Sequence, residues 1–357
     1  MRYTLHIFNF IAVLAILFAY ISAYISPADF SFFAFFGLIY PLLLVINLFF
    51  AVFWFYKKDK YFFISAIAIL IGWNFLGSFF QINFNKKTFS ENEYHLKVLS
   101  FNVRVFNLWN WSKDKKRREK TYNFIRKSNA DIVCLQEFYS SATYGKNAID
   151  SLQQKSKLNY RYVSFTKRKN KTYHHGIAIF SKYPIVSKGN VQPDNSENFC
   201  IYADIKVFND TLRVYSVHLE SIHLGREDYR VIDNPNNDTI SNVIQYKNIF
   251  RKLRTGYINR ARQVDLIAAH LEKSPYQVIV CGDFNDPPYS YSYHRITRKL
   301  TDAFKRSGLG VSGTYNRFGM FRIDYILHSK SLKSYNYKRF AVELSDHYPI
   351  KADFLLK

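Results

Sequence analysis

The first 85 residues almost lack charged side chains. They hold only four basic and two acidic residues: Arg2, Lys57, Lys58, Lys60, Asp29 and Asp59. The chain as a whole is too apolar to be disordered, and its composition is too irregular for a fibre. Three stretches carry no charge at all and are long enough to cross about 30 Å of hydrocarbon at a rise of 1.5 Å per residue. We therefore predict three transmembrane helices, within residues 5–25, 30–56 and 61–84.

Cysteine and proline are also scarce. The three cysteines, Cys134, Cys200 and Cys281, lie inside apolar runs, which does not suit a disulfide framework. Among the nine prolines, Pro41 falls within the second apolar stretch and should kink that helix. Asn47 is polar in the same stretch, and we expect it to face a neighbouring helix because hydrocarbon offers it no hydrogen-bond partner.

The short loops between the apolar stretches predict an orientation. The loop at residues 57–60 reads Lys-Lys-Asp-Lys, whereas residues 25–30 hold no lysine or arginine. The positive-inside rule then places the 57–60 loop and the N-terminus in the cytoplasm, and the rest of the chain outside it. Lys86 and Lys87 argue weakly against this orientation. A cleaved signal peptide is disfavoured because two further apolar stretches follow the first.

Beyond residue 85 the chain has few acidic residues relative to basic ones. Subtracting the four basic and two acidic residues above from totals of 50 and 27 leaves 46 and 25. This excess favours anionic partners. The basic segments at residues 113–120, 167–171 and 251–254 could track nucleic-acid phosphates, contact anionic lipid heads, or be merely solvated. Four aromatic residues in expected loops could stack on bases, enter a membrane interface or pack on the protein itself: Trp109, Trp111, Tyr139 and Tyr144.

From residue 94 the sequence alternates short β-rich runs with polar helices and loops. We predict a linker at residues 86–93 and one α/β domain at 94–357, with the membrane region at 1–85. Helices are expected at residues 114–128 and 258–271. Residues 221–259 are polar and include Asn-Pro-Asn-Asn, which indicates a long surface excursion.

Polar side chains stand directly after several apolar strands, where side chains converge in α/β proteins. They are Asn102, Glu137, His218, Asp283 with Asn285, and further on Asp324 and the pair Asp346-His347. Each of them alone has a structural explanation, such as a turn or a hydrogen-bonded core histidine. Their combination is more specific.

Together these motifs resemble the endonuclease/exonuclease/phosphatase, or DNase I-like, superfamily. The resemblance covers roughly residues 94–357 and rests on short motifs in a specific order. They are Ser100-Phe-Asn102-Val-Arg104, Leu135-Gln-Glu137, Gly176-Ile-Ala-Ile-Phe-Ser181, Val217-His218-Leu, Gly282-Asp283-Phe-Asn285, Arg322-Ile-Asp324-Tyr and Ser345-Asp346-His347. The resemblance implies a four-layer α/β/β/α sandwich, here preceded by three transmembrane helices.

A phosphodiester repels nucleophiles, so its hydrolysis needs a hard cation, an oriented water and donors for the developing charge. Glu137 is the expected ligand for Mg²⁺, with Mn²⁺ as the alternative, because such ions prefer carboxylate oxygen. The family pattern implies that Asn102 supports both the metal and the substrate, and Arg104 could also reach the phosphate or lie on the surface.

The resemblance also implies the roles of the remaining residues. Asp283 should orient or deprotonate the attacking water, and Asn285 should hold a phosphate oxygen. His347 should contact the phosphate, with Asp346 fixing its tautomer. His218 marks the branch of the family with a histidine beside the phosphate, and Asp324 should orient that histidine or complete the metal shell.

We therefore expect a membrane-anchored, metal-dependent phosphoesterase that acts outside the cytoplasm on a lipid-linked or membrane-proximal phosphodiester. An extracytoplasmic nuclease for DNA or RNA is the alternative, and the excess of basic over acidic residues favours it. A non-catalytic binding protein is less favoured, because degenerate members would be expected to lose an acid or a histidine of this set.

Overall fold

The computed structural model describes residues 2–84, 86–90, 93–108, 114, 116–140, 148–165, 174–191, 200–234 and 240–356. Trp109, Trp111, Tyr144 and the basic segment at 167–171 lie outside these residues. The chain forms two compact units. The first comprises Met1–Trp73, Glu220–Asp265 and Tyr289–Arg295, and the second Asn74–Leu219, Leu266–Pro288 and Ile296–Lys357. The domain limits proposed above at residues 85 and 94 stay a prediction.

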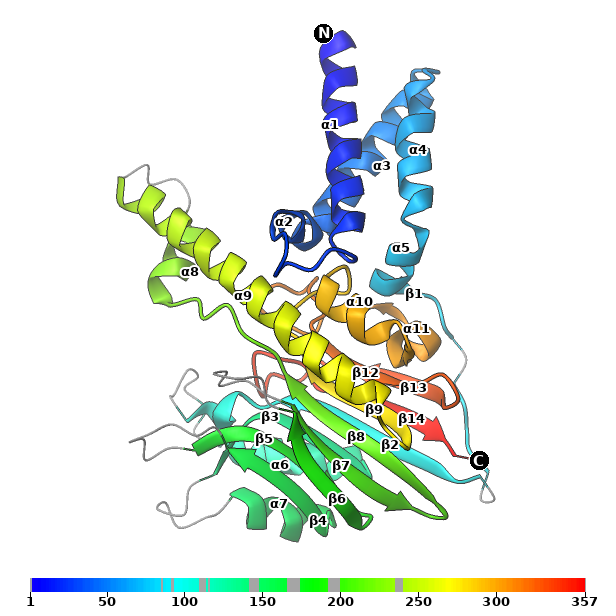
Figure 1. Cartoon of the computed structure of the whole chain (residues 1–357), viewed down its shortest axis with the longest axis vertical. Coiled ribbons are helices and arrows are strands. Elements are labelled where there is room, and N and C mark those ends of the chain that lie inside the picture. Colours follow the sequence, from blue (N-terminus) through cyan, green and yellow to red (C-terminus); the bar gives the residue numbers. More distant parts are fainter. Residues whose placement is uncertain are drawn as a thin grey trace. The chain divides into compact units, whose positions relative to one another are not determined.

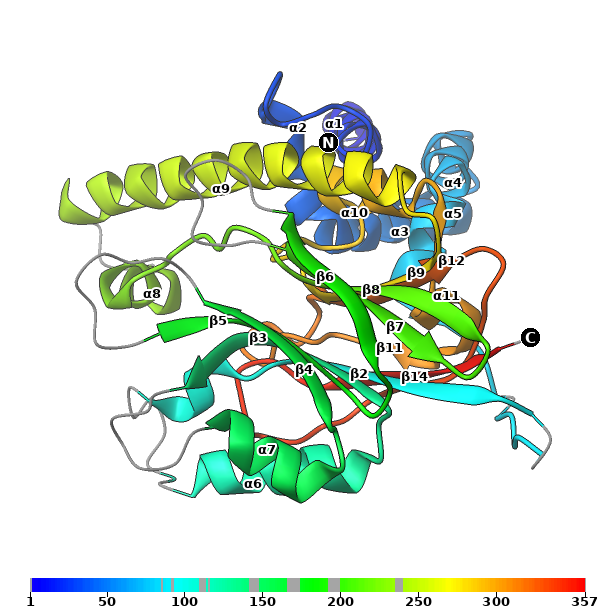
Figure 2. The same ribbon diagram turned by 60° about the horizontal axis from the view of Figure 1, so that its bottom comes forward.

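The second unit is built on two six-stranded sheets (Figures 1 and 2). One sheet has the order β13 (Lys333–Arg339), β14 (Ile350–Leu355), β2 (His95–Asn102), β3 (Ile132–Ser140), β5 (His174–Ser181) and β4 (Tyr160–Phe165). The other has the order β10 (Leu300–Asp302), β12 (Asp324–Ser329), β9 (Gln277–Asp283), β8 (Asp210–His218), β7 (Cys200–Val207) and β6 (Ile185–Val191). Both sheets are mixed, because β2 pairs with β3 and β8 with β9 in parallel while their neighbours are antiparallel.

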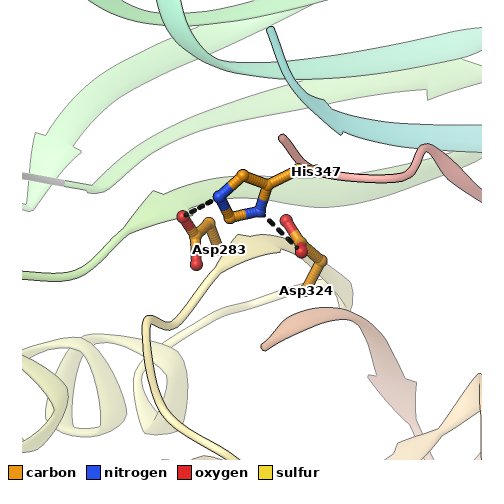
Figure 3. Close-up of side chains that lie close together, drawn as sticks. All are labelled: Asp283, Asp324 and His347. Carbon is orange, nitrogen blue, oxygen red and sulfur yellow. Dashed lines mark hydrogen bonds and ion pairs between the residues drawn. The ribbon is translucent and has the colours of Figure 1, made fainter. Parts of the chain in front are cut away.

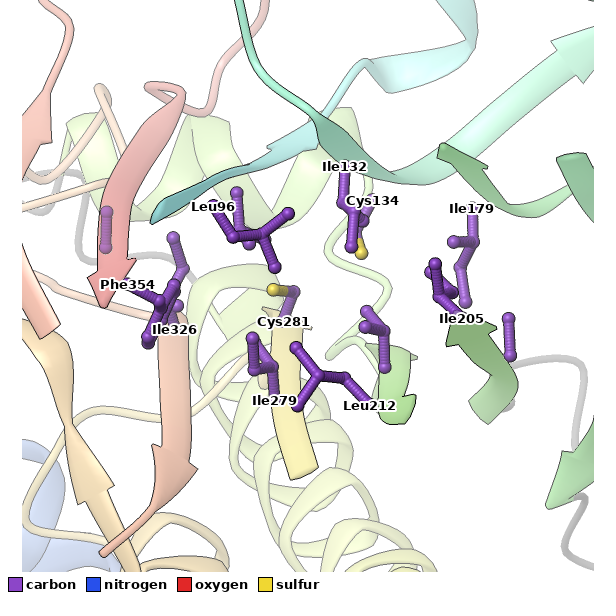
Figure 4. Packing of buried hydrophobic residues seen from close by; sticks show 14 of the residues in the cluster. Leu96, Ile132, Cys134, Ile179, Ile205, Leu212, Ile279, Cys281, Ile326 and Phe354 are labelled. Carbon is purple, nitrogen blue, oxygen red and sulfur yellow. The ribbon is translucent and has the colours of Figure 1, made fainter. Parts of the chain in front are cut away.

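Alternation along the strands places one set of side chains between the two sheets. In β2, Leu96 and Val98 point into this inner core, whereas Leu99 and Phe101 belong to the core on the outer face. Figure 4 shows the inner core, where Leu96 and Cys134 of one sheet lie near Cys281 of the other. All three cysteines are buried and free. The sandwich is thus held mainly by burial of aliphatic side chains, each worth about 1.5–3 kcal/mol.

Helices cover the outer faces of both sheets. Helices α6 (Arg117–Ser128) and α7 (Ala148–Ser156) cover the first sheet (Figure 2). Their residues Tyr122 and Leu152 belong to the outer core. On the second sheet, His270 near the end of α9 (Ile240–Glu272) contacts the rings of Tyr202 and Tyr215. The predicted α/β/β/α order is therefore confirmed. Tyr139 is buried in the outer core, so it packs on the protein itself rather than facing a ligand.

The second unit also includes the end of the apolar N-terminal region. Helix α5 (Trp73–Phe79) runs into β1 (Phe80–Gln81), which pairs with β11 (Gly310–Val311). The buried guanidinium of Arg322 donates to the backbone oxygen of Ser78 at 3.0 Å and pairs with Asp302 at 2.8 Å. Arg322 opens the motif that leads to Asp324, so this contact ties the apolar region to strand β12.

The first unit contains the apolar helices. Helix α1 (Arg2–Ile21) is long and apolar enough to cross a membrane. Helices α2 (Phe32–Leu38) and α3 (Tyr40–Tyr56) meet at a bend of 69°, and α4 (Tyr61–Ile71) meets α5 at 61°. By length and composition, the described residues thus offer one span, or up to three if each bent pair crosses as one. The break before α3 lies beside Pro41, in agreement with the predicted kink.

Polar side chains among these helices form hydrogen bonds and ion pairs with neighbouring helices. The amide of Asn47 donates to the backbone oxygen of Ala12 at 3.0 Å, as expected for a polar group facing a neighbouring helix. The hydroxyl of Ser65 donates to Asn9 at 2.6 Å. At one end of the bundle the Arg2 guanidinium pairs with Asp59 at 2.8 Å. These contacts pack α1, α3 and α4 as a bundle.

The predicted surface excursion at residues 221–259 is largely helical. It contains α8 (Arg226–Asp233) and most of α9, which has 33 residues and begins 18 positions before the helix predicted at residues 258–271. Residues Glu220–Asp265 belong to the same compact unit as the apolar helices, together with most of α10 (Tyr291–Thr297). The described part of the excursion is therefore mostly helical and belongs to that unit.

Candidate functional site

The first sheet supplies two site residues from adjacent parallel strands. Asn102 is the last residue of β2 and pairs with Gln136 of β3. The next residue, Glu137, lies in a β-bulge where the pairing of β3 with β5 shifts, and its φ is +48°. A bulge re-aims a side chain, and here the amide nitrogen of Asn102 donates to Glu137 Oε1 at 3.1 Å.

The second sheet places three site residues side by side. His218, at the end of β8, pairs in register with Asp283 at the end of β9, and Asp324, at the start of β12, pairs with Asp283 from the other side. Gly282 makes this arrangement possible, since its φ is +150° and a Cβ atom there would lie 2.0 Å from the Val217 oxygen.

The two sets of residues meet at the carboxylate of Asp283. Its Oδ2 atom accepts hydrogen bonds from the side-chain amides of Asn102 at 3.0 Å and Asn285 at 3.3 Å. The Nε2 atoms of His218 and His347 each lie 3.7 Å from the same oxygen, which is an ion-pair distance rather than a hydrogen bond. His218 Nε2 also lies 3.8 Å from Glu137 Oε1. Asp283 is therefore the centre of the site.

His347 lies between two carboxylates, as Figure 3 shows. Its Nδ1 is 2.9 Å from Asp324 Oδ2, and its Nε2 faces Asp283. The expectation that Asp346 fixes the tautomer of His347 is wrong, because the carboxylate bonded to the ring is that of Asp324. Asp324 therefore orients His347 rather than His218, the histidine it was expected to orient. Asp346 instead pairs with Arg104 at 3.2 Å and accepts from the Ser345 hydroxyl at 3.1 Å. The chain turns at Ser345, so neighbours in sequence point differently.

Asn285 is bonded mainly to its own motif and to the adjoining strand end. Its backbone N–H donates to Asp283 Oδ1 at 2.8 Å, and its side-chain amide donates to the Leu219 oxygen at 3.0 Å. Asn285 also has a positive φ of 52°, which asparagine tolerates better than most residues. These bonds hold the Asp283 carboxylate in place, while the phosphate contact expected of Asn285 stays a prediction.

Burial and neighbouring charges shift the proton affinities of the site. Burial raises the pKa of Asp283 from 3.8 to about 6, although the two histidines and the Asn285 N–H act in the opposite direction. For His347, burial lowers the pKa, but the carboxylates of Asp324 and Asp283 outweigh this and raise it well above 6.5. The site thus favours a charged imidazole beside a carboxylate that takes up a proton at mildly acidic pH.

The residues present suit a divalent cation. Partial burial and the nearby Asp346 carboxylate raise the pKa of Glu137, and a cation would offset both effects. Asp324 Oδ1 is buried and has no hydrogen-bond partner among the described residues. Asp283, Asp324 and His347 each offer a donor atom, and these three atoms lie within 4.8 Å of one another. Glu137 with Asn102, or this trio, could hold a cation.

Two supporting contacts were not predicted. The Thr314 hydroxyl accepts from the backbone N–H groups of Ile323 and Asp324, both at 3.0 Å, and so fixes the start of β12. The Gln136 amide donates to the Ser216 hydroxyl at 3.0 Å and links the two sheets next to the site. The position of Gln136 next to Glu137 in a family motif could have indicated its contact. No motif near Thr314 in the sequence indicates the contact that Thr314 makes.

Comparison with known proteins identifies the family. The model of the Endonuclease/Exonuclease/phosphatase family matches residues 99–347, and a domain of unknown function matches residues 2–79. No curated protein matches the chain.

Solved structures share the fold at low sequence identity. An endonuclease/exonuclease/phosphatase from Beutenbergia cavernae has a TM-score of 0.54 and 15% identity over 73% of this chain and 72% of that one. A mannosyl-6-phosphatase from Bacteroides thetaiotaomicron has a TM-score of 0.51 and 17% identity over 73% and 100%. The human Nocturnin catalytic domain has a TM-score of 0.53 and 18% identity over 73% and 95%. The chain belongs to the endonuclease/exonuclease/phosphatase family and is a metal-dependent hydrolase of phosphoester bonds.

Proposed function

We propose that this enzyme is a membrane-anchored, divalent-metal-dependent phosphodiesterase that acts outside the cytoplasm on a lipid-linked or membrane-proximal phosphodiester. The observation that carries the proposal is the convergence of Asn102, His218 and His347 on the Asp283 carboxylate, in a chain that also contains apolar helices. Glu137 adjoins this cluster through its contacts with Asn102 and His218. A tether of this kind restricts the site to substrates close to the bilayer.

The proposed roles follow from charge and geometry. Glu137, supported by Asn102, would hold Mg²⁺ or Mn²⁺, which supplies charge neutralisation and polarises the phosphate when bound. Asp283 accepts a proton from the attacking water, since its raised pKa of about 6 lies near the operating range of a general base. His347, held by Asp324, presents a cationic N–H toward the phosphate, and His218 lies on the other side of Asp283.

Two further residues belong to this proposal. Arg104, which pairs with Asp346, provides a second cation at the edge of the site, and Asp346 limits its movement. In this proposal the positive charges of His347 and Arg104 together offset the negative charge of the bound phosphate. The proposed orientation, with the N-terminus in the cytoplasm and the catalytic unit outside, rests on the lysine-rich 57–60 loop.

An extracytoplasmic nuclease is the second candidate. The observation that favours it is the excess of 46 basic over 25 acidic residues beyond residue 85, out of totals of 50 and 27, because such an excess attracts a polyanion. The catalytic residues would be the same for both candidates, so only the substrate distinguishes them.

The test is hydrolysis by the full-length protein in detergent, offered sphingomyelin-like and glycerophospholipid substrates, single-stranded and duplex DNA, and RNA in parallel. Each reaction is run with Mg²⁺, Mn²⁺ or EDTA. Asp283→Asn should abolish the activity, and Asp210→Asn, which changes an exposed aspartate on the same strand as His218, is the matched control.

Release of a lipid head group that EDTA and Asp283→Asn both abolish would support the proposal. Cleavage confined to nucleic acid, with the same controls, would refute the lipid assignment and favour the nuclease. An unchanged rate in Asp283→Asn would refute the proposed mechanism.

A further inference from the structure

Helix α9 has one face that is tied to the protein. Asp228 of α8 accepts hydrogen bonds from Gln245 at 2.6 Å and from Lys252 at 2.5 Å, and it also accepts from the Gly225 N–H. Gln245, Ile249 and Lys252 lie one turn apart along the helix, and Ile249 is buried. These contacts fix the rotation of α9 about its axis, so the opposite face is directed away from α8.

That opposite face, which we call the front face, combines apolar and basic side chains. Its apolar members are between 42% and 56% exposed: Val243, Ile244, Tyr246 and Phe250. Its basic members, also exposed, are Lys247, Arg251 and Arg254. No acidic residue lies between positions 242 and 258 of the helix. Exposed apolar groups interleaved with cations characterise helices that lie in a membrane interface.

The front face joins an apolar segment of the same unit. The ring of Phe35 in α2 stacks on Phe250, with centroids 4.2 Å apart and planes 6° from parallel. Nearby, the Arg254 Nε donates to the Ser31 hydroxyl at 3.1 Å. Phe30 and Phe32, which precede Phe35, are about half exposed. A continuous exposed surface therefore runs from residues 29–35 onto the front face of α9.

A cavity of about 270 Å³ lies between the two parts of this surface. Its walls include Pro27, Phe32 and Ile258, and its two charged groups are Asp29 and Arg254. Arg254 uses only Nε in a hydrogen bond within the part of the chain that the structure describes. One cation and one anion among apolar rings complement a zwitterionic lipid head group, with its phosphate at the guanidinium and its amine at the carboxylate.

We propose that the front face of α9 and residues 29–35 form a docking surface for the head-group layer of a phospholipid bilayer, with a lipid phosphate held by Arg254 in the cavity. Four half-exposed apolar side chains enter the interface, and the cations contact lipid phosphates. This inference rests on the proposed membrane anchoring but not on the proposed hydrolysis.

The surface has a consequence for the enzyme through chain connectivity. The excursion that carries α9 begins at Glu220, next to Leu219, whose oxygen accepts the hydrogen bond from Asn285. The Glu220 oxygen in turn accepts from Arg260 of α9 at 2.9 Å. Helix α9 is thus hydrogen-bonded to Glu220, which lies two residues after His218 at the end of strand β8.

The test places a fluorophore on the front face. Phe250→Cys in the full-length protein is labelled with a nitrobenzoxadiazole group and reconstituted in nanodiscs of phosphatidylethanolamine and phosphatidylglycerol. The three native cysteines are buried, which directs the label to position 250. Val186→Cys, at a position 58% exposed in the catalytic unit, is the matched control, and Ile244→Cys repeats the measurement on the same face.

We expect the labels at 250 and 244 to emit at shorter wavelength and to be quenched by doxyl-labelled lipid, while the label at 186 is quenched by aqueous iodide. Arg254→Ala should reduce lipid quenching at position 250, and Arg298→Ala, at an exposed arginine outside the surface, should not. Equal access of iodide to positions 250, 244 and 186 would overturn the proposal.

Hydrolysis measured on the same samples separates this proposal from the function proposed above. Lipid quenching at position 250 without turnover of any phosphodiester would uphold the docking surface and count against the proposed function. Turnover with a water-exposed label would do the reverse.

Discussion

The folded state holds the ionised form of Asp283 at a cost, and this leads to a measurable prediction. The pKa of this buried carboxyl rises from 3.8 to about 6 on folding, mainly because of desolvation. The folded protein therefore binds more protons than the unfolded chain between these two values, so stability falls as pH rises through this window. One pKa unit corresponds to about 1.36 kcal/mol.

Between pH 4 and pH 6.5 this effect amounts to roughly 2 kcal/mol for a shift from 3.8 to about 6. His347 does not obscure it, because a histidine with a raised pKa contributes its full stabilisation below its unfolded value of about 6.5. Asp283→Asn cannot ionise, although it loses hydrogen bonds from Asn102 or Asn285 that each contribute about 1 kcal/mol at any pH.

The difference in stability between Asp283→Asn and the wild type should therefore change with pH. Relative to the wild type, the variant should gain roughly 2 kcal/mol from pH 4 to pH 6.5, or roughly 4 to 8 °C in Tm. The assay is thermal unfolding of the detergent-solubilised protein in EDTA at both pH values, with Asp210→Asn as the control. A constant difference at the two pH values would refute the assignment of a raised pKa to Asp283.

Three further predictions concern other parts of the site. Asp324→Asn should lower kcat by roughly 10² to 10⁴ with little change in KM, because His347 loses the carboxylate that orients it; an unchanged kcat, or a loss confined to KM, would contradict this role. Glu137→Gln should raise the Mg²⁺ concentration needed for half-maximal activity while Tm in EDTA stays the same or rises, since burial and Asp346 raise the pKa of Glu137; a metal requirement equal to that of the wild type would exclude Glu137 as a ligand. Arg322→Met should destabilise the protein by roughly 3 to 5 kcal/mol, because it removes the ion pair between Arg322 and the buried Asp302 carboxylate; the measurement is Tm relative to an exposed Arg298→Met control, and equal Tm values would contradict this.

The sequence was sufficient to predict how the site is assembled from strand ends. Asn102, His218 and Asp283 each end an apolar run, and parallel pairing of β2 with β3 and of β8 with β9 aligns such ends. The family motifs added Asp324 and His347, which do not follow a parallel strand. The expected layers were also found, because apolar alternation within the strands determines which face is buried.

Other features depend on contacts between residues far apart in sequence. The resemblance led us to expect that Asp346 binds His347, yet a turn directs the ring to Asp324, 23 positions earlier. Strand β6 was not predicted, since its sequence Ile-Val-Ser-Lys-Gly-Asn-Val contains glycine and polar residues, and pairing with β7 along one side stabilises it. The full length of α9 was missed for a similar reason, because Gln245 and Lys252 in its first half are held by Asp228, which lies 17 and 24 positions away in the sequence.

The pairing of β1 with β11 determines where the chain can be cut to remove its apolar helices. A chain cut at residue 86 to remove every apolar helix would also remove Ser78 and β1, and with them a hydrogen-bond acceptor of the buried Arg322 and the partner of an edge strand. A cut at residue 74 keeps both. The last apolar turn is therefore part of the scaffold behind Asp324, and a protein cut at residue 86 would lose support for the carboxylate that holds the ring of His347.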